Sequence, residues 1–571
     1  YLQKLEGTAG RNDMTVILAE MFAKADPEEA RLIAYMTQGK LGPAYKSPDF
    51  GVANKSMLKA LGPEAKIIFD KVGDLGLVVE KLKNSKTRKL ETNSKDQNIK
   101  QVYDKLWEIA TISGTGSVDR KQELILNLLS DLDPVGAKYA VKMILGKLRT
   151  GFSDMTVLDS LSWMLVGSKK LKSQIESMYN VRADLGEIAQ KIKKSKNQKI
   201  KNFNIEPEIG TPVLMARCER AKTPQNIWER NNICALEYKL DGLRIQAHVK
   251  KTQKIKNSKT QIQLFSRGLE DVTHMYPDIC DGLARQINND CIVEGEMIAL
   301  GKEGRFLPFQ ETVQRKRKYD IAEMAKKVPL KIYLFDVLMI DGKNVMRETN
   351  ENRREILGKM YLAGETVKLM PRIIAKSTDD IKKFFERAIK DGTEGIIAKK
   401  LDGEYAAGAR DFNWIKYKES YDQSTMADTL DVVVMGYDEG QGKRSKFGIG
   451  DFLAGVYDPK SEKYFTVAKV GTGLTDEEWR EMKRLLSAQC SVLNDKPDKF
   501  EVSNQMKCDY WVEPKIVVEL LADEITKSPM HTSGFALRFP RLVSWREKLP
   551  TDVTSTKELE KMFKLQKTGG D

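Results

Sequence analysis

The chain has 571 residues, 41% of them hydrophobic and 31% charged, which is typical of a soluble globular protein with three or four domains. No apolar run approaches the roughly 18 residues that a membrane-spanning helix needs, which excludes an integral helical membrane protein, and we find no secretory or transit signal. The 95 Lys and Arg residues exceed the 81 Asp and Glu residues, and the net charge of +14 favours a polyanionic partner, although charge alone does not separate nucleic acid from a membrane or from a merely soluble face.

The first part of the chain, residues 1–208, is predicted to form an all-α domain. Its apolar residues recur at three- and four-residue spacing, as in the pattern that begins at Asp133 and Pro134, a plausible N-cap and first-turn pair. Two lysine-rich stretches, 81–89 and 191–201, interrupt the helical pattern. We predict that both are solvated loops and that the second is an interdomain linker.

A glycine-containing stretch in this region has two possible roles. Gly114 and Gly116 precede Ser117 and a predicted helix. Free amide groups at a helix N-terminus can bind a phosphate. An ordinary N-cap fits the same residues equally well, so both interpretations stay open.

The middle part, residues 209–418, changes to the two-residue period of β-strands and is predicted to be an α+β domain. Strands are predicted at 291–300, 330–342 and 394–400, and a helix at 379–392.

The last part, residues 419–571, contains short predicted strands separated by turns, which favours a small β-barrel. These strands are predicted at 428–438, 451–458, 463–471 and 515–525. A capping box at 555–558 predicts a final amphipathic helix.

Within the middle part, Asp241 and Gly242 separate two strand-like runs, which predicts a tight β-hairpin. In such a hairpin Lys239 lies directly opposite Arg244 on one face. Two neighbouring cations repel each other unless an anion lies between them, so the pattern indicates a phosphate site. A solvated hairpin with a chance basic pair is the alternative.

Other charged residues of the chain are unusually placed, some of them at strand positions that would otherwise bury aliphatic side chains. Glu294 and Glu296 alternate on one face of a predicted strand, although each alone could face solvent. Glu394 follows a turn, and Lys416 and Lys418 share a face. Near the end, basic residues surround Pro540, either as a site or as a solvated edge: Arg538, Arg541, Arg546 and Lys548.

The order of these motifs resembles that of the ATP-dependent DNA ligases, which are covalent nucleotidyltransferases. The series runs KLDGLR (239–244), SRG (266–268), EGE (294–296), FDVLMIDG (335–342), EGIIAKK (394–400), NWIKYK (413–418) and LRFPR (537–541). Stretches such as LPFQETVQRKRK and GTGSVDRK are similar to the archaeal and eukaryotic replicative branch. The resemblance covers nearly the whole chain and implies a helical DNA-binding domain (1–208), an adenylation domain (209–418) and an OB-fold domain with a C-terminal helix (419–571).

The resemblance implies nick sealing in three steps, with ATP as AMP donor and Mg²⁺ as cofactor. Lys239 attacks the α-phosphate of ATP, AMP passes to the 5′-phosphate of a nick, and the 3′-hydroxyl then displaces AMP. The nucleophilic amine must be uncharged, and we expect neighbouring cations, namely Arg244, Lys416, Lys418 and Mg²⁺, to lower the pKa of Lys239.

The resemblance also assigns roles to the remaining motif residues. Glu237 would read the adenine edge, Phe335 would stack on the base, and Glu296 would contact the ribose. Arg244 and Arg267 would contact phosphate or sugar, and Lys416 and Lys418 the α-phosphate. Arg538 and Arg541, with Arg546 and Lys548 as further candidates, would contact the pyrophosphate. Glu296 and Glu394 would place the metal. Glu294, where many relatives carry Asp, and Lys399 are weaker candidates.

The expected partner is nicked double-stranded DNA, held by its backbone with little base readout. Sliding-clamp binding is possible but unsupported, because the corresponding stretch at 90–103 lacks paired aromatic residues. We expect a monomer without a membrane partner, in the cytoplasm near the nucleoid, or in the nucleus of a eukaryote. Six cysteines without a Cys-x-x-Cys pair favour a reducing compartment and disfavour an NAD-dependent ligase, whose zinc segment is cysteine-rich.

Two other functions remain possible at this stage. One is an RNA ligase or capping guanylyltransferase of the same superfamily, which the long helical section and the RFPR motif disfavour. The other is a nucleic-acid-binding module without catalytic activity.

Overall fold

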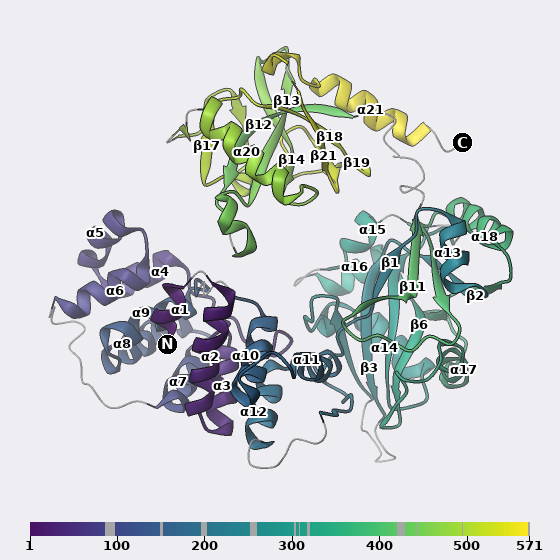
Figure 1. Cartoon of the computed structure of the whole chain (residues 1–571), viewed down its shortest axis with the longest axis horizontal. Coiled ribbons are helices and arrows are strands. Elements are labelled where there is room, and N and C mark those ends of the chain that lie inside the picture. The colour runs from purple at the N-terminus through teal and green to yellow at the C-terminus, as the bar shows by residue number, and fades with distance from the viewer. Residues whose placement is uncertain are drawn as a thin grey trace. The chain divides into compact units, whose positions relative to one another are not determined.

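The computed structural model describes the chain except for residues 9, 86–97, 149–151, 196–202, 252–259, 302–303, 308, 317–319, 419–428, 441, 491, 494, 547 and 569–571. The chain divides into two compact units, Tyr1–Tyr417 and Lys418–Asp571 (Figure 1). Among the described residues, no helix combines the length and the apolar character needed to cross a membrane.

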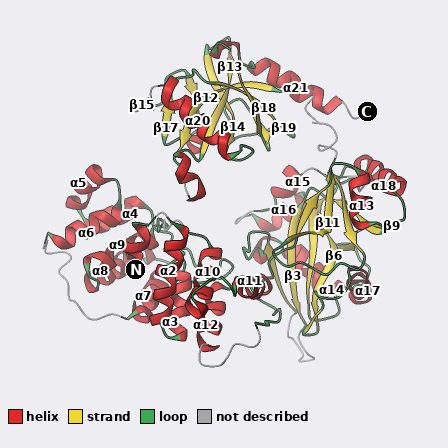
Figure 2. Cartoon of the chain, viewed as in Figure 1, coloured by secondary structure: helices red, strands yellow, loops and turns green. Residues whose placement is uncertain are grey.

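The N-terminal region consists of short helices, coloured red in Figure 2. They are α1 Leu2–Glu6, α2 Arg11–Lys24, α3 Pro27–Met36, α4 Asn54–Leu61, α5 Pro63–Val72, α6 Leu75–Asn84, α7 Ile99–Thr111, α8 Ser117–Asp131, α9 Pro134–Ile144, α10 Asp154–Val166, α11 Lys172–Val181 and α12 Leu185–Ser195. Asp133 caps α9 by accepting a hydrogen bond from the backbone N–H of Gly136, and Pro134 occupies the first turn, as predicted. Gly116 is the N-cap of α8, with a left-handed φ of 77°.

The two lysine-rich stretches are partly helical, so the loop prediction is wrong for their described residues. Helix α6 continues to Asn84 and α12 to Ser195, while 86–89 and 196–201 lie outside the described residues. The physical reason is that these lysines bind carbonyls at the ends of other helices. Lys83 Nζ donates to Leu129 O at 2.6 Å near the end of α8, and Lys193 Nζ donates to Phe22 O at 2.7 Å near the end of α2.

The central region contains two β-sheets flanked by helices. Its strands are β1 Arg217–Arg220, β2 Cys234–Lys239, β3 Leu243–Lys250, β4 Gln261–Ser266, β5 Cys291–Ala299, β6 Leu330–Ile340, β7 Lys343–Asn344, β8 Val367–Leu369, β9 Arg372–Ala375, β10 Gly395–Lys400 and β11 Arg410–Lys418. Its helices are α13 Pro224–Asn231, α14 Pro277–Gln286, α15 Phe309–Val313, α16 Ile321–Lys327, α17 Asn350–Met360 and α18 Thr378–Lys390. The predicted strands at 291–300, 330–342 and 394–400 and the helix at 379–392 are confirmed.

The two central sheets have different strand orders. The first is β1-β11-β10-β2-β9, and the second is β4-β3-β5-β6-β7 with β8 also paired to β6. Each sheet has its own apolar core, with Leu236 and Ile396 in the first and Val293 and Leu334 in the second. The sheets are joined by the short turn between β2 and β3.

This turn overturns the predicted hairpin. Strands β2 and β3 belong to different sheets, so Lys239 pairs with Gly395 of β10 and Arg244 pairs with Glu296 of β5. The chain passes from one sheet to the other at Gly242, where an added Cβ would lie 2.3 Å from the carbonyl oxygen of Met297. The Asp-Gly pair is therefore needed for a close backbone approach and does not form a two-residue hairpin loop.

The helical and central regions pack together within the first unit. Leu214 N donates to Asn180 O at 2.8 Å, and the rings of Tyr45 and Phe265 meet edge to face at 5.6 Å. The predicted domain boundary after residue 208 stays a prediction.

The second unit is rich in strands, and the predicted fold class is confirmed for all three parts of the chain. Its strands are β12 Leu430–Asp438, β13 Asp451–Asp458, β14 Lys463–Val470, β15 Val492–Leu493, β16 Phe500–Glu501, β17 Tyr510–Val512, β18 Val517–Leu521, β19 Glu524–Lys527, β20 Phe535–Arg538 and β21 Arg541–Arg546. Its helices are α20 Asp476–Gln489 and α21 Thr556–Thr568. Strands β15-β17-β12-β13-β14-β16 form one sheet, in which β18 joins β12 to β21. The capping box before α21 is confirmed, since Ser555 Oγ accepts from Glu558 N and Glu558 Oε2 accepts from Ser555 N.

Candidate active site

Neighbouring strands bring most of the predicted residues together. Strand β2 carries Glu237 and Lys239, and the adjacent β10 begins directly after Glu394. Because Lys239 pairs with Gly395, the backbone N–H of Glu394 reaches the carbonyl oxygen of Lys239 at 3.0 Å. The second sheet contributes Arg244 from β3 and Glu296 from β5, which pair across the two strands.

We call Lys239, Glu296 and Glu394 the lysine–carboxylate cluster. The ammonium of Lys239 forms an ion pair and a hydrogen bond with Glu394 Oε2, and their side chains are 20% and 17% exposed. Burial acts to lower the pKa of Lys239, but Glu394, Glu296 and Asp241 outweigh it, so the pKa is raised above its ordinary value. The expectation that neighbouring cations lower this pKa is therefore wrong for the protein without bound substrate.

The carboxyl of Glu296 has the opposite balance. Burial raises its pKa to about 7, and the nearby cations Lys239 and Arg244 offset only part of that effect. This group therefore gains or loses a proton near neutral pH.

A second charged pair lies beside the cluster. Arg244 Nη2 donates to Glu294 Oε2 at 2.7 Å, and Arg244 Nη1 donates to the carbonyl of Ala216 at 2.7 Å. Glu294 is fully buried, so the alternative that it faces solvent is wrong. Its other oxygen lies 3.3 Å from Nε2 of Gln246, which is also buried. Glu294 thus holds Arg244 in place.

Glu237, two residues before Lys239 on β2, belongs to what we call the buried cluster: Glu237, Phe335, Lys399 and Trp414. Glu237 is 2% exposed and Lys399 is 0% exposed, with 2.7 Å between Oε2 and Nζ. Lys399 Nζ also donates to Phe335 O at 3.1 Å and lies 4.7 and 4.3 Å from the ring centres of Phe335 and Trp414. The ion pair and cation–π contacts therefore satisfy this buried ammonium.

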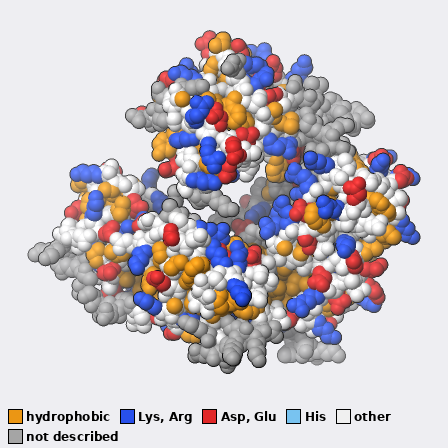
Figure 3. Space-filling view, in the orientation of Figure 1, with side chains coloured by type: hydrophobic (Ala, Val, Ile, Leu, Met, Phe, Trp, Pro, Cys, Tyr) orange, Lys and Arg blue, Asp and Glu red, His pale blue; other side chains and the backbone are white. Residues whose placement is uncertain are grey.

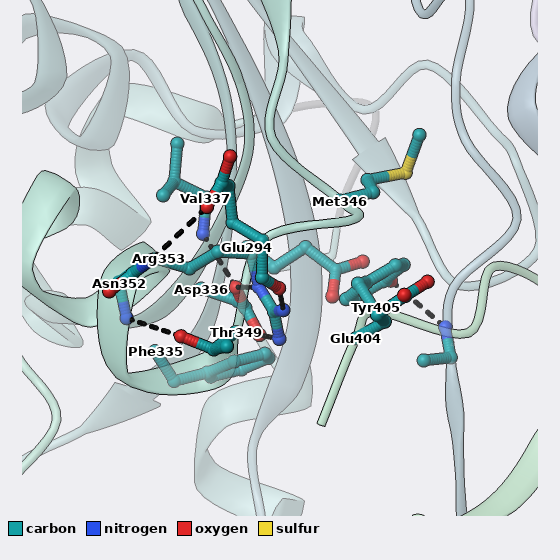
Figure 4. A network of polar contacts seen from close by, with 12 residues as sticks. Glu294, Phe335, Asp336, Val337, Met346, Thr349, Asn352, Arg353, Glu404 and Tyr405 are labelled. Atoms are coloured by element: carbon teal, nitrogen blue, oxygen red, sulfur yellow. Dashed lines mark hydrogen bonds and ion pairs between the residues drawn. The ribbon is translucent and has the colours of Figure 1, made fainter. Parts of the chain in front are cut away.

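Phe335 is supported from behind by a second buried ion pair. Arg353 of α17 donates to both carboxylate oxygens of Asp336, at 2.7 and 3.2 Å, and both side chains are 0% exposed (Figure 4). Arg353 Nη1 also donates to the carbonyls of Glu348 and Gly403. This network anchors strand β6 at the position that presents the Phe335 ring.

The other predicted residues of the first unit lie on strand β11 and in the turn after β4. Lys416 and Lys418 alternate along β11 and share a face. Burial raises the pKa of the Cys218 thiol, while the nearby cations Arg244, Lys239 and Lys416 act to lower it. Arg267 is exposed, and the described part of the chain gives it no hydrogen bond or ion pair. Ile245 of β3 pairs with Ser266 of β4, so Arg267 directly follows the residue paired next to Arg244, and its contact with phosphate or sugar stays a prediction.

The basic residues near Pro540 belong to the second unit. Arg541 Nη2 lies 2.6 Å from Asp523 Oδ1, and Arg538 Nη1 lies 3.6 Å from Glu524. Phe539 between them has a left-handed φ of 52°, and its side chain is 55% exposed. Further along, Arg546 and Lys548 both form ion pairs with Asp431.

The lysine–carboxylate cluster has a donor set that fits Mg²⁺. Within the described ranges, no group of three or more His, Cys, Asp or Glu side chains is arranged to hold a metal. Mg²⁺ commonly takes only one or two carboxylates and keeps several waters, so Glu296 and Glu394 fit that requirement.

Sequence reasoning missed Trp414 and Arg372 and gave Lys399 little weight. Trp414 was visible only as part of the NWIKYK motif, and its 3% exposure and contact with Lys399 depend on strand order. Arg372 is the cross-strand partner of Glu237, a pairing between residues far apart in the sequence.

Comparison with known proteins covers the whole chain. Family models match at residues 1–162 (DNA ligase N terminus), 212–418 (ATP dependent DNA ligase domain) and 445–549 (ATP dependent DNA ligase C terminal region). The chain is 41% identical to a probable DNA ligase of Dictyoglomus turgidum, covering 99% of this chain and 97% of that protein. It is 36% identical to DNA ligases of Hyperthermus butylicus and Sulfolobus acidocaldarius, with 99% and 96% covered in both cases. A solved structure named Pmar-Lig_PreS3 has a similar fold, with a TM-score of 0.52, 16% identity and coverage of 96% and 98%.

Proposed function

The chain belongs to the ATP-dependent DNA ligase family, and we propose that Lys239 is the residue through which this DNA ligase takes AMP from ATP. The observation that carries this proposal is the position of its amine beside two carboxylates: Glu394, directly before the adjacent strand β10, and Glu296, on β5 of the second sheet. A lysine with a purely structural role would not need two acidic neighbours. The carboxyl of one of them, Glu296, also has a pKa raised to about 7, and such shifted pKa values are typical of functional sites.

In the first step, the uncharged amine of Lys239 attacks the α-phosphorus of ATP. A P–N bond forms, the bond from the α-phosphorus to the bridging oxygen breaks, and pyrophosphate leaves. Because the pKa of Lys239 is raised in the unloaded protein, Nζ must lose a proton first, and Glu394 holds that proton in a hydrogen bond. When bound, Mg²⁺ would neutralise phosphate charge and offset the carboxylates that raise this pKa.

The other residues position the nucleotide. Arg244 is held by Glu294 for a contact to phosphate or sugar, and Lys416 and Lys418 face the α-phosphate. Phe335 stacks on the base, and Arg538 and Arg541 orient the leaving pyrophosphate. The last role requires the second unit to close over the nucleotide, which is a lid motion.

In the second and third steps, AMP passes from Lys239 to the 5′-phosphate of a nick, and the 3′-hydroxyl then displaces AMP to seal the strand. The reaction serves DNA replication, repair and recombination inside the cell. The net charge of +14 suits contacts to the DNA backbone without base readout, and Figure 3 shows Lys and Arg side chains on the viewed face. We propose a monomer on nicked duplex DNA. Most of the stretch corresponding to a clamp motif, 90–97, lies outside the described residues.

The test is incubation with labelled ATP and Mg²⁺ followed by acid and alkali treatment. The protein should acquire an acid-labile, alkali-stable label, and Lys239→Ala should abolish it while nick binding persists. Lys250→Ala, which removes an exposed lysine at the end of β3, is the matched control and should label normally. A protein that binds nicked DNA but never acquires the label would be a binding module instead.

The substrate is tested by sealing assays on DNA and RNA nicks with ATP or GTP. Sealing of nicked DNA with ATP is expected, whereas preference for RNA or GTP would favour the RNA ligase or capping alternative. Binding to nicked DNA should weaken about 10³-fold or more between 50 and 200 mM salt if six or more phosphates are contacted. Affinity that does not change with salt would contradict backbone binding.

A further inference from the structure

Glu237 carries a buried oxygen that has no hydrogen bond. Its Oε2 is bound by Lys399 at 2.7 Å, while its Oε1 is buried and has no partner among the described residues. A buried carboxylate oxygen without a donor is costly, and functional sites are where such groups persist. The orphan oxygen is an acceptor only, so the missing partner must be a hydrogen-bond donor.

A matching orphan donor belongs to the neighbouring strand. Arg372 of β9 is the direct antiparallel partner of Glu237 of β2, and its Nε–H is buried without a hydrogen bond in the described part of the chain. Directly opposite residues on antiparallel strands share a face, with Cβ atoms about 4.5–5.5 Å apart. An acceptor and a donor are therefore presented side by side on one face of the sheet.

Lys399 determines which oxygen of Glu237 is available beside Arg372. By occupying Oε2 it leaves only Oε1 for a ligand, and by donating to Phe335 O it ties the same carboxylate to the strand that carries the Phe335 ring. The ammonium lies under the rings of Phe335 and Trp414, so it cannot turn away without losing these contacts.

We propose that Arg372 Nε–H completes the reading of the Watson–Crick edge of the base in ATP, beside Glu237 Oε1, to which the family resemblance already assigns the adenine edge. Adenine offers a donor, the 6-amino group, next to an acceptor, N1, which complements the pair. Guanine offers an acceptor, O6, next to a donor, N1–H, so both contacts would be mismatched. Arg372 is then a specificity-determining residue and Lys399 a positioning residue. This inference rests on the proposed function, because it assumes that ATP binds with its base at Glu237.

The test uses two ATP analogues, each of which removes one contact. In 1-deaza-ATP a C–H replaces N1, and in purine riboside triphosphate a hydrogen replaces the 6-amino group. We expect the efficiency of Lys239 labelling in the wild-type protein to fall about tenfold to hundredfold with either analogue, as for the loss of one hydrogen bond to a charged group.

The variant Arg372→Met removes the donor but keeps an apolar side chain of similar length. With ATP its labelling efficiency should fall about tenfold to hundredfold, with little further loss on 1-deaza-ATP and the full loss on purine riboside triphosphate. Arg285→Met, which removes an exposed arginine of α14, should keep the wild-type pattern.

The inference is overturned if Arg372→Met still discriminates against 1-deaza-ATP, as would happen if a buried water joined the two orphan groups. It is also overturned if wild-type protein labels equally with ATP and 1-deaza-ATP, a comparison that needs no variant. Wild-type protein that acquires no label from any nucleotide would refute the proposed function as well, so the two failures are distinguishable.

Discussion

The buried cluster and the lysine–carboxylate cluster share strand β2 but hold their charges in different ways. Glu237 and Lys399 are almost fully buried and paired one to one, whereas Lys239 and Glu394 are partly exposed and a third charge, Glu296, adjoins them. A buried one-to-one pair favours one arrangement, because breaking it leaves a charge in a medium of low polarity. A partly exposed group of three can exchange protons, which a reacting amine requires.

The largest effect expected from this comparison is on stability. Lys399→Met leaves the carboxylate of Glu237 buried without its cation and should lower the free energy of unfolding by about 3–5 kcal/mol. Lys400→Met, at the next position, removes a lysine that is 43% exposed and pairs with Asp402 at 3.3 Å. That control should cost no more than about 1 kcal/mol. Urea unfolding of the two variants measures the difference. Equal midpoints would show that the buried ion pair contributes no more to stability than the exposed one.

The next effect concerns the proton on Lys239. Glu394→Gln removes the carboxylate that does most to raise the pKa of Lys239, so this pKa should fall. At pH 8 the uncharged fraction of Lys239 then rises, by about tenfold for each unit by which its pKa falls. The measurement is the rate at which an amine-reactive reagent modifies Lys239, followed by peptide mass spectrometry in the absence of metal.

Glu386→Gln is the matched control, because Glu386 is an exposed residue of α18 and the same charge is removed. Its Lys239 should react at the wild-type rate. Faster modification in both variants would indicate general loosening of the fold rather than the loss of one carboxylate.

The smallest effect is a change in how stability depends on pH. The pKa of Glu296 is about 7 in the folded protein, above the ordinary value of 4.5, so the folded state holds this proton more tightly than the unfolded chain. Its contribution to stability is fully present below about pH 4.5 and is lost as pH rises through 7. Because the side chain is partly exposed, we expect a loss of about 1–2 kcal/mol.

Glu296→Gln cannot ionise and should therefore gain stability relative to the wild-type protein between pH 5 and pH 8. Thermal or urea unfolding at the two pH values provides the test. A difference between variant and wild type that is the same at both values would contradict the raised pKa.

Much of the site could be predicted because its signals are local or ordered along the chain. The strand periods of 291–299 and 395–400 placed Glu294, Glu296 and Lys399 on strands, and the order of the motifs indicated Lys239 as the nucleophile. The Asp-Gly hairpin was wrong because an Asp-Gly pair marks a tight backbone passage without saying which strands flank it. Only the pairing of β2 with β10 and of β3 with β5 shows that the chain changes sheets there.

Charge environments were the least predictable feature. From sequence, Lys239 was expected among cations, whereas the folded chain brings Glu394 to it because β10 pairs with β2. The same pairing placed Lys399 against Glu237, and the β2–β9 pairing placed Arg372 there. Each contact joins residues separated by more than 130 positions, which no local pattern can register.

The sequence by itself determined the family and the three-part fold class and predicted the nucleophile, because periodicity, turn residues and motif order are properties of neighbouring positions. The tertiary structure alone decided which carboxylate faces Lys239, which oxygen of Glu237 is left without a hydrogen bond among the described residues and which arginine is its cross-strand neighbour. Electrostatic energy depends on distance through space and on burial, and both are fixed only when distant strands pair.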